Sequence, residues 1–242
     1  SKTGLYPLYV TYSLFRRRLE EYIKAECIDK ETVSVQEEQV VWDDIVKDNM
    51  YVICNTPMAV GITRRTLFGF RQVDQKANIK NVQLIERASK DQEGLVKELK
   101  SVGFWKGNSS KQEMKFNAVV GNPPYQIKDG GAGASAKPIY NQFVDLAKAI
   151  KPNYMSMIMP AKWYSGGRGL DSFRQSMLSD RSISHLFDFI DSHDCFTKVD
   201  IAGGVCYFLR DKFYNGNCVV STIRNGKTTV VTRNLNELDV FV

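Results

Sequence analysis

Apolar side chains recur at intervals of three and four residues in several stretches of the chain, which is the period of an amphipathic helix. Pro7 is tolerated only in the first turn of a helix, so the first stretch begins near Gly4. Residues 86–112 are polar and rich in Lys and Glu, which is typical of a helix and a surface loop. The periodic stretches predict helices over residues 5–23, 58–68, 139–150 and 170–178.

Short apolar runs indicate buried strands between these helices. Near the end of the chain, Asn225-Gly226 readily adopts the positive φ angles of a tight turn, so residues 217–232 are predicted to form a β-hairpin. The other strands are predicted at residues 50–54, 82–85, 116–120, 154–159, 183–190 and 204–210.

The alternation of strands and helices favours an α/β fold, with a mostly parallel sheet and helices on both faces. The last three strands follow one another without intervening helices, so we expect antiparallel pairing at that end of the sheet. A loop rich in Gly, Ala and Ser over residues 126–138 follows the strand 116–120.

The composition is that of an ordinary globular protein. A chain of 242 residues that is 43% hydrophobic and 25% charged excludes collagen, a coiled coil and a disordered chain. No window approaches about 18 consecutive apolar residues, so we expect no membrane-spanning helix. The 33 Lys and Arg outnumber the 27 Asp and Glu, and the net charge of +6 is compatible with a nucleic-acid partner without requiring one.

The cysteines are odd in number and widely spaced, which favours reduced thiols in a cytoplasmic protein. No C-x-x-C pair is present, and two histidines are too few to complete a zinc site, so no metal site is expected. The five cysteines are Cys27, Cys54, Cys195, Cys206 and Cys218.

The segment Asn122-Pro123-Pro124-Tyr125 ends the predicted strand 116–120 and is the main candidate for chemistry. Ligands of open α/β sheets bind at the carboxyl ends of strands. Each proline fixes φ, removes a donor and restricts the residue before it, so this turn is stiff. The Asn122 amide then projects from the strand end, and Tyr125 offers a flat face for stacking. A tight turn without chemistry is the alternative explanation.

A planar substrate that carries an NH2 group suits such a turn. The side-chain oxygen of Asn122 and a backbone carbonyl both accept hydrogen bonds from the amine, which frees the nitrogen lone pair for attack. Stacking on an aromatic ring contributes about 1–3 kcal/mol per base.

The run Phe116-Asn-Ala-Val-Val-Gly-Asn-Pro-Pro-Tyr125 resembles motif IV of the amino-methyltransferases that use S-adenosylmethionine. The flanking segments resemble adenine-specific DNA methylases of restriction–modification systems, above all the methylase domain of type IIG-like enzymes. The similarity covers residues 1 to about 210. The segments that carry it are Lys137-Pro-Ile-Tyr-Asn-Gln-Phe143, Ser156-Met-Ile-Met-Pro-Ala-Lys-Trp163 and Ser165-Gly-Gly-Arg-Gly169.

The resemblance implies the Rossmann-like methyltransferase fold over residues 1–212, with a first strand expected upstream of the sequence. Residues 213–242 are then a hairpin extension, and we expect it to lead into a target-recognition domain. The implied reaction transfers a methyl group from S-adenosylmethionine to the exocyclic amine of an adenine flipped out of double-stranded DNA. The implied catalytic residues are Asn122, Pro123, Pro124 and Tyr125.

The resemblance also implies a cofactor site. The segment Ser1-Lys2-Thr3-Gly4 is similar to the end of the Gly-rich loop of this fold, although Lys2 stands where a glycine is common. Many relatives carry an acidic residue after the second strand to bind the ribose, whereas this chain has Cys54, Asn55 and Thr56. The residues expected at the cofactor are Lys2, Thr3, Gly4, Asn55, Thr56, Glu86 and Asn122.

DNA contacts are expected from the loop after the catalytic turn and from a neighbouring strand end. These contacts are assigned to Lys128, Lys137, Trp163 and Arg168. A nuclease and a specificity domain, in the same or another chain, are further expected partners.

Two alternatives remain open. The same turn serves methyl transfer to a protein glutamine or to an RNA amino group. The irregular residues 1–4 and 54–56 also allow a catalytically inactive DNA-recognition or scaffold module.

Overall fold

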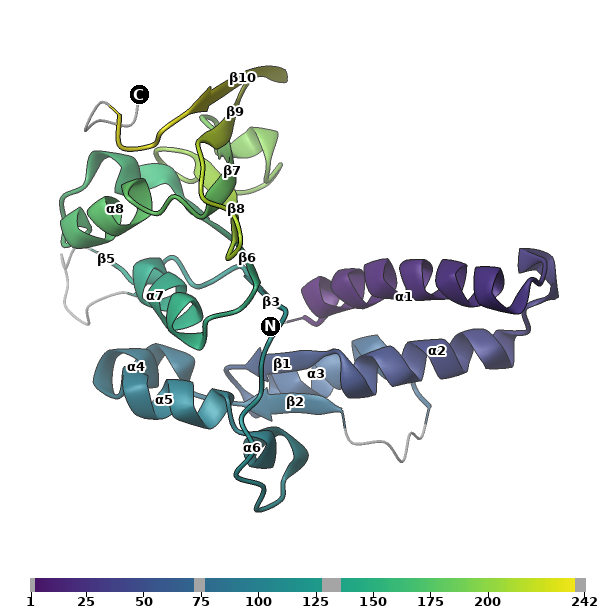
Figure 1. The fold of residues 1–242 in the computed structure, drawn as a ribbon. Helices are drawn as coiled ribbons and strands as arrows, with labels where there is room; N and C mark the ends of the chain where they lie inside the picture. The colour runs from purple at the N-terminus through teal and green to yellow at the C-terminus, as the bar shows by residue number, and fades with distance from the viewer. Residues whose placement is uncertain (1–2, 72–76, 128–135, 238–242) are drawn as a thin grey trace. The chain divides into compact units, whose positions relative to one another are not determined.

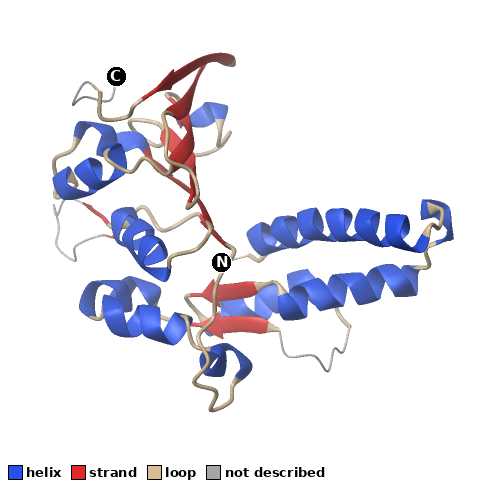
Figure 2. Cartoon of the chain, viewed as in Figure 1, coloured by secondary structure: helices blue, strands red, loops and turns tan. Residues whose placement is uncertain are grey.

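The computed structural model describes residues 3–71, 77–127 and 136–237 and is shown in Figures 1 and 2. The chain forms two compact units. Unit 1 comprises Ser1–Lys90 and Lys97–Glu113, and unit 2 comprises Asp91–Val96 and Met114–Val242. This division falls inside the span 1–212 that was expected to be one catalytic domain.

Unit 1 begins with two helices that lie side by side, α1 (Leu5–Glu26) and α2 (Val35–Asp48), joined through the 3-10 turn η1 (Lys30–Thr32) (Figure 1). The first helix confirms the prediction over 5–23. The second was not predicted. A capping box starts it, in which the Ser34 hydroxyl accepts from the Glu37 amide and the Glu37 carboxylate accepts from the Ser34 amide.

Two short parallel strands follow in unit 1, β1 (Tyr51–Cys54) and β2 (Asn78–Asn81), connected through α3 (Pro57–Phe68). The predicted strand at 82–85 is wrong. Val82 makes one more backbone hydrogen bond, to the Cys54 carbonyl. Leu84 then begins a helix, so the apolar run is divided between a strand end and a helix face. Three helices follow, α4 (Leu84–Lys90), α5 (Gln92–Leu99) and α6 (Val102–Lys106), of which α5 starts in residues of unit 2 and ends in residues of unit 1.

Unit 2 is built on a sheet with the strand order β10-β9-β7-β8-β6-β3 among the described residues. β3 pairs parallel to β6, and β7 pairs parallel to β9. β8 runs antiparallel to both β6 and β7, and β10 runs antiparallel to β9. Four of these six strands therefore run in one direction, and the expected mostly parallel sheet with late antiparallel strands is confirmed. The strands are β3 (Ala118–Gly121), β6 (Tyr154–Pro160), β7 (Ile183–Phe189), β8 (Val205–Asp211), β9 (Cys218–Arg224) and β10 (Lys227–Arg233).

The core of unit 2 lies between one face of this sheet and the helices α7 (Tyr140–Ile150) and α8 (Asp171–Leu178). Alternate residues of β6, namely Met155, Met157 and Met159, point into it. On the other face of the sheet, Phe187 and Tyr207 stack with ring centroids 4.5 Å apart.

The hairpin of β9 and β10 belongs to unit 2, because β9 pairs with β7 along its length. The expected boundary at residue 212 therefore does not separate a hairpin extension from the sheet. Within the described ranges, no helix has both the length and the apolar character that a membrane span requires.

Candidate active site at the Asn122–Tyr125 turn

The turn Asn122–Tyr125 follows β3 directly. Gly121, the last strand residue, pairs with Met157 of β6, and the chain then leaves the sheet. Pro123 is buried, whereas Asn122 and Pro124 are exposed. No side-chain hydrogen bond engages the Asn122 amide within the described part of the chain. The sequence thus places a free amide on a stiff, anchored turn at the carboxyl end of a parallel strand.

Tyr125 is fixed by its backbone and by the short strands that follow. Its carbonyl accepts a hydrogen bond of 3.2 Å from the amide of Ile139, the residue before α7. The strands β4 (Gln126–Ile127) and β5 (Lys137–Pro138) pair antiparallel, with Ile127 opposite Lys137. The structure thus brings the exposed Lys137 close to the Asn122–Tyr125 turn. Lys128 lies outside the described residues.

The Tyr125 hydroxyl is buried and has no hydrogen-bond partner among the described residues. Burial raises the pKa of this hydroxyl to about 12, and the thiols of Cys195 and Cys206 add to the effect. Tyr125 is therefore neutral at physiological pH, and its ring, rather than a phenolate, is what it offers to a substrate.

A buried polar cluster lies near this turn and is formed by Trp163, Tyr164, Asp188 and Cys206. The Trp163 indole N–H donates to Cys206 Sγ at 3.3 Å. Burial raises the pKa of the Asp188 carboxyl, and the neighbouring Tyr164 hydroxyl partly offsets this effect. Sequence reasoning missed Asp188, although an aspartate between two phenylalanines in a strand is a signal of a buried polar role.

The expectation that Trp163 contacts DNA is wrong. Its side chain is fully buried, and its ring packs edge-on against Tyr164 and Phe173. Trp163 therefore belongs to the core of unit 2. Arg168 is exposed, in a turn where it adopts a φ of 50°, so DNA contact by Arg168 stays a prediction.

Gly4 and Thr3 lie at the start of α1 in unit 1, and Lys2 is outside the described residues. Gly4 has a φ of 75°, and a Cβ added there would lie 2.9 Å from the Thr63 Cα and 2.8 Å from the Thr66 Cβ. The Thr66 hydroxyl also donates to the Thr3 carbonyl at 3.0 Å. The space next to Gly4 is thus filled by α3, and the need for glycine is explained by helix packing.

Asn55, Thr56 and Glu86 follow the two parallel strands of unit 1. The Asn55 carbonyl accepts a hydrogen bond of 3.2 Å from Gln83, which joins the loops after β1 and β2. Thr56 caps α3, because its hydroxyl accepts from the Ala59 amide at 3.2 Å. Hydrogen bonding and charge from Lys90 lower the pKa of Glu86. The structure therefore groups these three residues at one edge of the strand pair.

The chemistry of these groups fits the ribose and adenine of S-adenosylmethionine in part. The exposed Asn55 amide and the ionised Glu86 carboxylate can both form hydrogen bonds with hydroxyl or amino groups. Cys54, at the acidic position of many relatives, is fully buried and shares a contact of 3.5 Å with the Thr63 hydroxyl. The buried Cys54 thiol is therefore not available to a ligand, and the exposed Asn55 is the first polar side chain after it.

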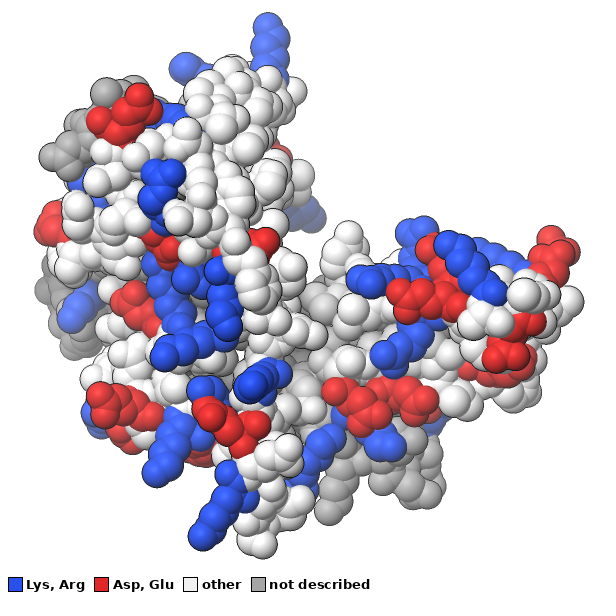
Figure 3. All heavy atoms as spheres, in the orientation of Figure 1, with Lys and Arg blue, Asp and Glu red and all other residues white. Residues whose placement is uncertain are grey.

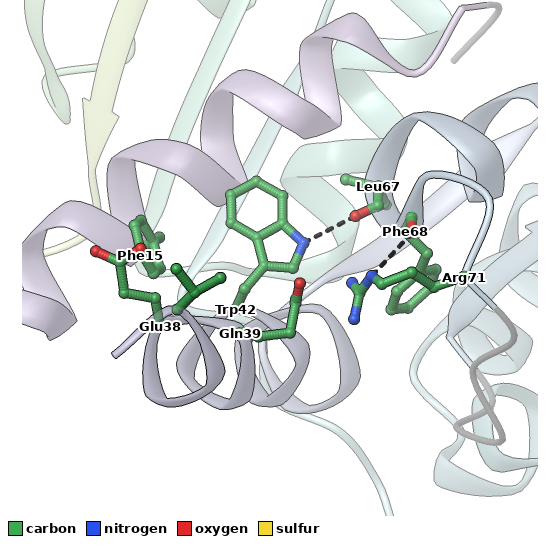
Figure 4. A pocket seen from close by; sticks show the side chains of 8 residues that line it. Phe15, Glu38, Gln39, Trp42, Leu67, Phe68 and Arg71 are labelled. Atoms are coloured by element: carbon green, nitrogen blue, oxygen red, sulfur yellow. Dashed lines mark hydrogen bonds between the residues drawn. The ribbon is translucent and has the colours of Figure 1, made fainter. Parts of the chain in front are cut away.

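A groove of about 310 Å³ lies elsewhere in unit 1 and is shown in Figure 4. The Trp42 indole donates to the Leu67 carbonyl at 2.8 Å, and Arg71 forms two hydrogen bonds with Asp43. These polar groups already have partners, and no predicted site residue lines the groove. In the part of the chain that the structure describes, no cluster of three or more His, Cys, Asp or Glu residues is arranged to hold a metal.

Comparison with known proteins shows the family. Residues 48–196 match the Eco57I restriction-modification methylase family, and this match spans more than half of the chain. The chain belongs to that family. An uncharacterized adenine-specific methylase of Mycoplasma pneumoniae is 37% identical over 134 residues, which are 53% of this chain and 32% of that protein. The Eco57I-family chain thus spans about a third of the length of this curated relative.

Solved structures support the fold of this Eco57I-family chain. The DNA-bound ATP-dependent type ISP restriction-modification enzyme LlaBIII has a TM-score of 0.54 and 13% identity, over 96% of this chain and 17% of the enzyme. A nuclease-deletion mutant of the type ISP enzyme LlaGI, in complex with a DNA substrate mimic, has a TM-score of 0.50 and 13% identity. The alignment covers 95% of this chain and 22% of the LlaGI chain.

Proposed function

We propose that this chain is the catalytic region of an adenine-specific DNA methyltransferase of a restriction–modification system. The observation that carries the proposal is the exposed Asn122 amide, held on a Pro-Pro turn at the carboxyl end of β3. Membership of the Eco57I methylase family and the adenine-specific methylase relative support this substrate over a protein or an RNA.

The turn acts on the amine of the adenine. The Asn122 side-chain oxygen and the Pro123 carbonyl accept hydrogen bonds from the two N–H groups, which draws the nitrogen toward tetrahedral geometry. The Tyr125 ring stacks on the flipped base and fixes its plane. Because the turn is anchored to α7 through the Tyr125 carbonyl, its acceptors are positioned before the substrate arrives.

Asn55 and Glu86 are the residues of unit 1 that we assign to S-adenosylmethionine. When bound, S-adenosylmethionine would supply a methyl group on a positively charged sulfur, which would serve as the leaving group, and the amine held by the turn would release one proton to water. The partner is double-stranded DNA, and flipping the adenine costs a few kcal/mol. We assign the choice of target sequence and DNA cleavage to other parts of the restriction–modification system.

Nucleoside mass spectrometry tests the proposal on the full-length protein. DNA is taken from a host that makes no methylated adenine of its own and that expresses the wild type, Asn122→Ala or Asn236→Ala. Asn236 is an exposed asparagine outside the turn and is the matched control. We expect methylated adenine with the wild type and Asn236→Ala, and a loss of roughly 100-fold or more with Asn122→Ala.

Soluble wild-type protein that leaves adenine unmethylated in host DNA would overturn the proposal. Assays of the same preparation with radiolabelled S-adenosylmethionine and cell protein or RNA would then test the other amino-group substrates. A chain that binds no S-adenosylmethionine by calorimetry would be the inactive module instead.

A further inference from the structure

The carboxyl ends of four strands of unit 2 lie along one edge of the sheet, since β3, β6, β7 and β9 run in the same direction. Pro160 of β6 pairs with Val205 of β8, which in turn pairs with Phe189 of β7. Phe189 pairs with Ile223, the residue before Arg224. The edge that carries the Asn122 turn therefore also carries the turn between β9 and β10.

This second turn is a tight hairpin that is anchored to its neighbour. Arg224 pairs with Lys227, and the two residues between them, Asn225 and Gly226, have φ angles of 52° and 70°. This is the pattern of a two-residue type I′ turn. The Asn225 amide donates a hydrogen bond of 3.0 Å to the Asp194 carboxylate, which lies in the loop after β7. The tip is thus held in place.

The side chains at this tip carry two positive charges. Arg224 and Lys227 are exposed, and neither forms an ion pair within the described ranges. Residues that face each other across an antiparallel pair lie on the same side of it, and like charges there are destabilising. An anion bound between the two side chains removes that repulsion.

Other cations occupy the same edge, and its acidic groups are partly engaged. The exposed Lys162 follows β6, with its aliphatic stem over Gly203. Asp191 accepts from the His193 ring at 2.8 Å, and Asp194 is bound to the hairpin as described. Asp200 is exposed. Lys and Arg side chains project in Figure 3 from the region that Figure 1 labels β10.

The distance from β3 to β9 along this edge can be expressed as a number of base pairs along a DNA duplex. Four strand-to-strand steps separate β3 from β9, which is about 19 Å at about 4.8 Å per step. A base pair occupies about 3.4 Å of the duplex axis, so this distance corresponds to roughly six base pairs. A duplex that runs along this edge with its target base at Asn122 therefore has phosphates within reach of the hairpin.

We propose that the β9–β10 turn, through Arg224 and Lys227, binds backbone phosphates of the DNA about half a helical turn from the methylated adenine. This inference rests on the proposed function. Phosphate contacts of this kind orient a duplex without reading its sequence. The hairpin then sets the angle at which the duplex crosses the sheet edge.

The test measures DNA affinity of the full-length protein by fluorescence anisotropy over a series of salt concentrations. The hairpin variant Arg224→Gln/Lys227→Gln is compared with the control variant Arg181→Gln/Lys212→Gln. Arg181 and Lys212 are also exposed, but they lie at the opposite edge of the sheet, where β7 begins and β8 ends. Each lost phosphate contact lowers the slope of log K against log salt by about 0.9. We expect a slope lower by about 1.8 for the hairpin variant, a loss of tens of fold in affinity at 0.1 M salt, and no change for the control.

The charge-preserving variant Arg224→Lys/Lys227→Arg should keep both the affinity and the salt slope. If the Gln hairpin variant keeps the wild-type DNA affinity and salt slope, the inference is refuted and the methyltransferase proposal stays intact. The same holds if both Gln variants lose DNA affinity equally. A wild-type protein that binds no DNA would instead overturn the proposed function itself. Thermal melts of all variants check that each is folded.

Discussion

The Tyr125 carbonyl accepts a hydrogen bond of 3.2 Å from the Ile139 amide, so the end of the Asn122–Tyr125 turn is tied to the start of α7. Ile139 is almost fully buried, and α7 packs its apolar face into the core of unit 2. The position of the Tyr125 ring is therefore set by the packing of a helix, and the Asn122 acceptor shares that support.

Two substitutions of Tyr125 measure the contributions of its ring and of its hydroxyl separately. Because the hydroxyl is buried without a partner in the described residues, Tyr125→Phe should keep methyl transfer and change the free energy of unfolding by less than about 1 kcal/mol. Tyr125→Ala loses the stacking surface, and we expect a loss of about 1–3 kcal/mol in transition-state stabilisation. Steady-state kinetics with urea unfolding measure both. Equal losses in the two variants would show that the hydroxyl, not the ring, matters.

Gly4→Ala should destabilise unit 1 more than Gly107→Ala. Both glycines have a φ near 70°, which costs an L-residue about 1–2 kcal/mol. A Cβ at Gly107 meets nothing within 4 Å, whereas one at Gly4 collides with Thr63 and Thr66. Overpacking adds roughly 1–3 kcal/mol at Gly4 only. Thermal unfolding without any cofactor measures the difference, and equal shifts in the two variants would contradict the packing explanation.

Asp180 should stabilise unit 2 in a pH-dependent way. Burial alone would raise the pKa of its carboxyl, but the ion pairs with Lys148 and Arg210, both 2.9 Å long, hold the pKa below its ordinary value. A lowered native pKa means that the stabilisation is complete above about pH 4 and is lost as the pH falls through the native value. Asp180→Asn should therefore cost about 1–3 kcal/mol at pH 7 and little in strong acid.

Urea unfolding at several pH values measures the Asp180 effect. Glu21→Gln is the control, because it breaks the exposed Arg17–Glu21 pair and should change stability by less than about 1 kcal/mol at any pH. A cost for Asp180→Asn that is the same at pH 7 and in strong acid would show that the ion pairs are not its source.

Trp163→Ala should unfold the protein rather than weaken DNA binding selectively. The side chain is fully buried beside Phe173, so its removal should cost about 3–5 kcal/mol. Trp163→Phe should cost less, since most of the ring volume remains. DNA affinity is measured per folded molecule at low temperature. A normal melting temperature with lost DNA binding in Trp163→Ala would restore the contact that the buried position excludes.

The sequence predicted most of unit 2 because its strands are short apolar runs with clear stops. The turn after β3 and the Asn225-Gly226 hairpin carry local signals that need no tertiary information. The pairing of β9 with β7 could not be predicted, because the sequence of a strand does not specify which strand it pairs with, and the paired residues His185 and Val219 are 34 positions apart. Trp163 was misassigned for a related reason, since a tryptophan at a strand end looks the same whether it faces solvent or the core.

Unit 1 was harder to predict from the sequence. The helix α2 has exposed apolar residues such as Val35 and Val40 among many charges, which obscures its period. The run at 82–85 was ambiguous because short apolar stretches suit strands and helix faces equally well. Gly4 was expected at the cofactor, and the structure adds a contact with α3 that no local pattern reveals.

The distribution of thiols over the two units makes this chain suitable for distance measurements without mutation. Cys27 in unit 1 is exposed and Cys195 in unit 2 is partly exposed, whereas Cys54, Cys206 and Cys218 are buried. Burial raises the pKa of Cys195, so a maleimide dye should react first at Cys27 and then at Cys195. Stepwise labelling would therefore place a donor on one unit and an acceptor on the other. Energy transfer between them would then report the separation of the two units as DNA is added.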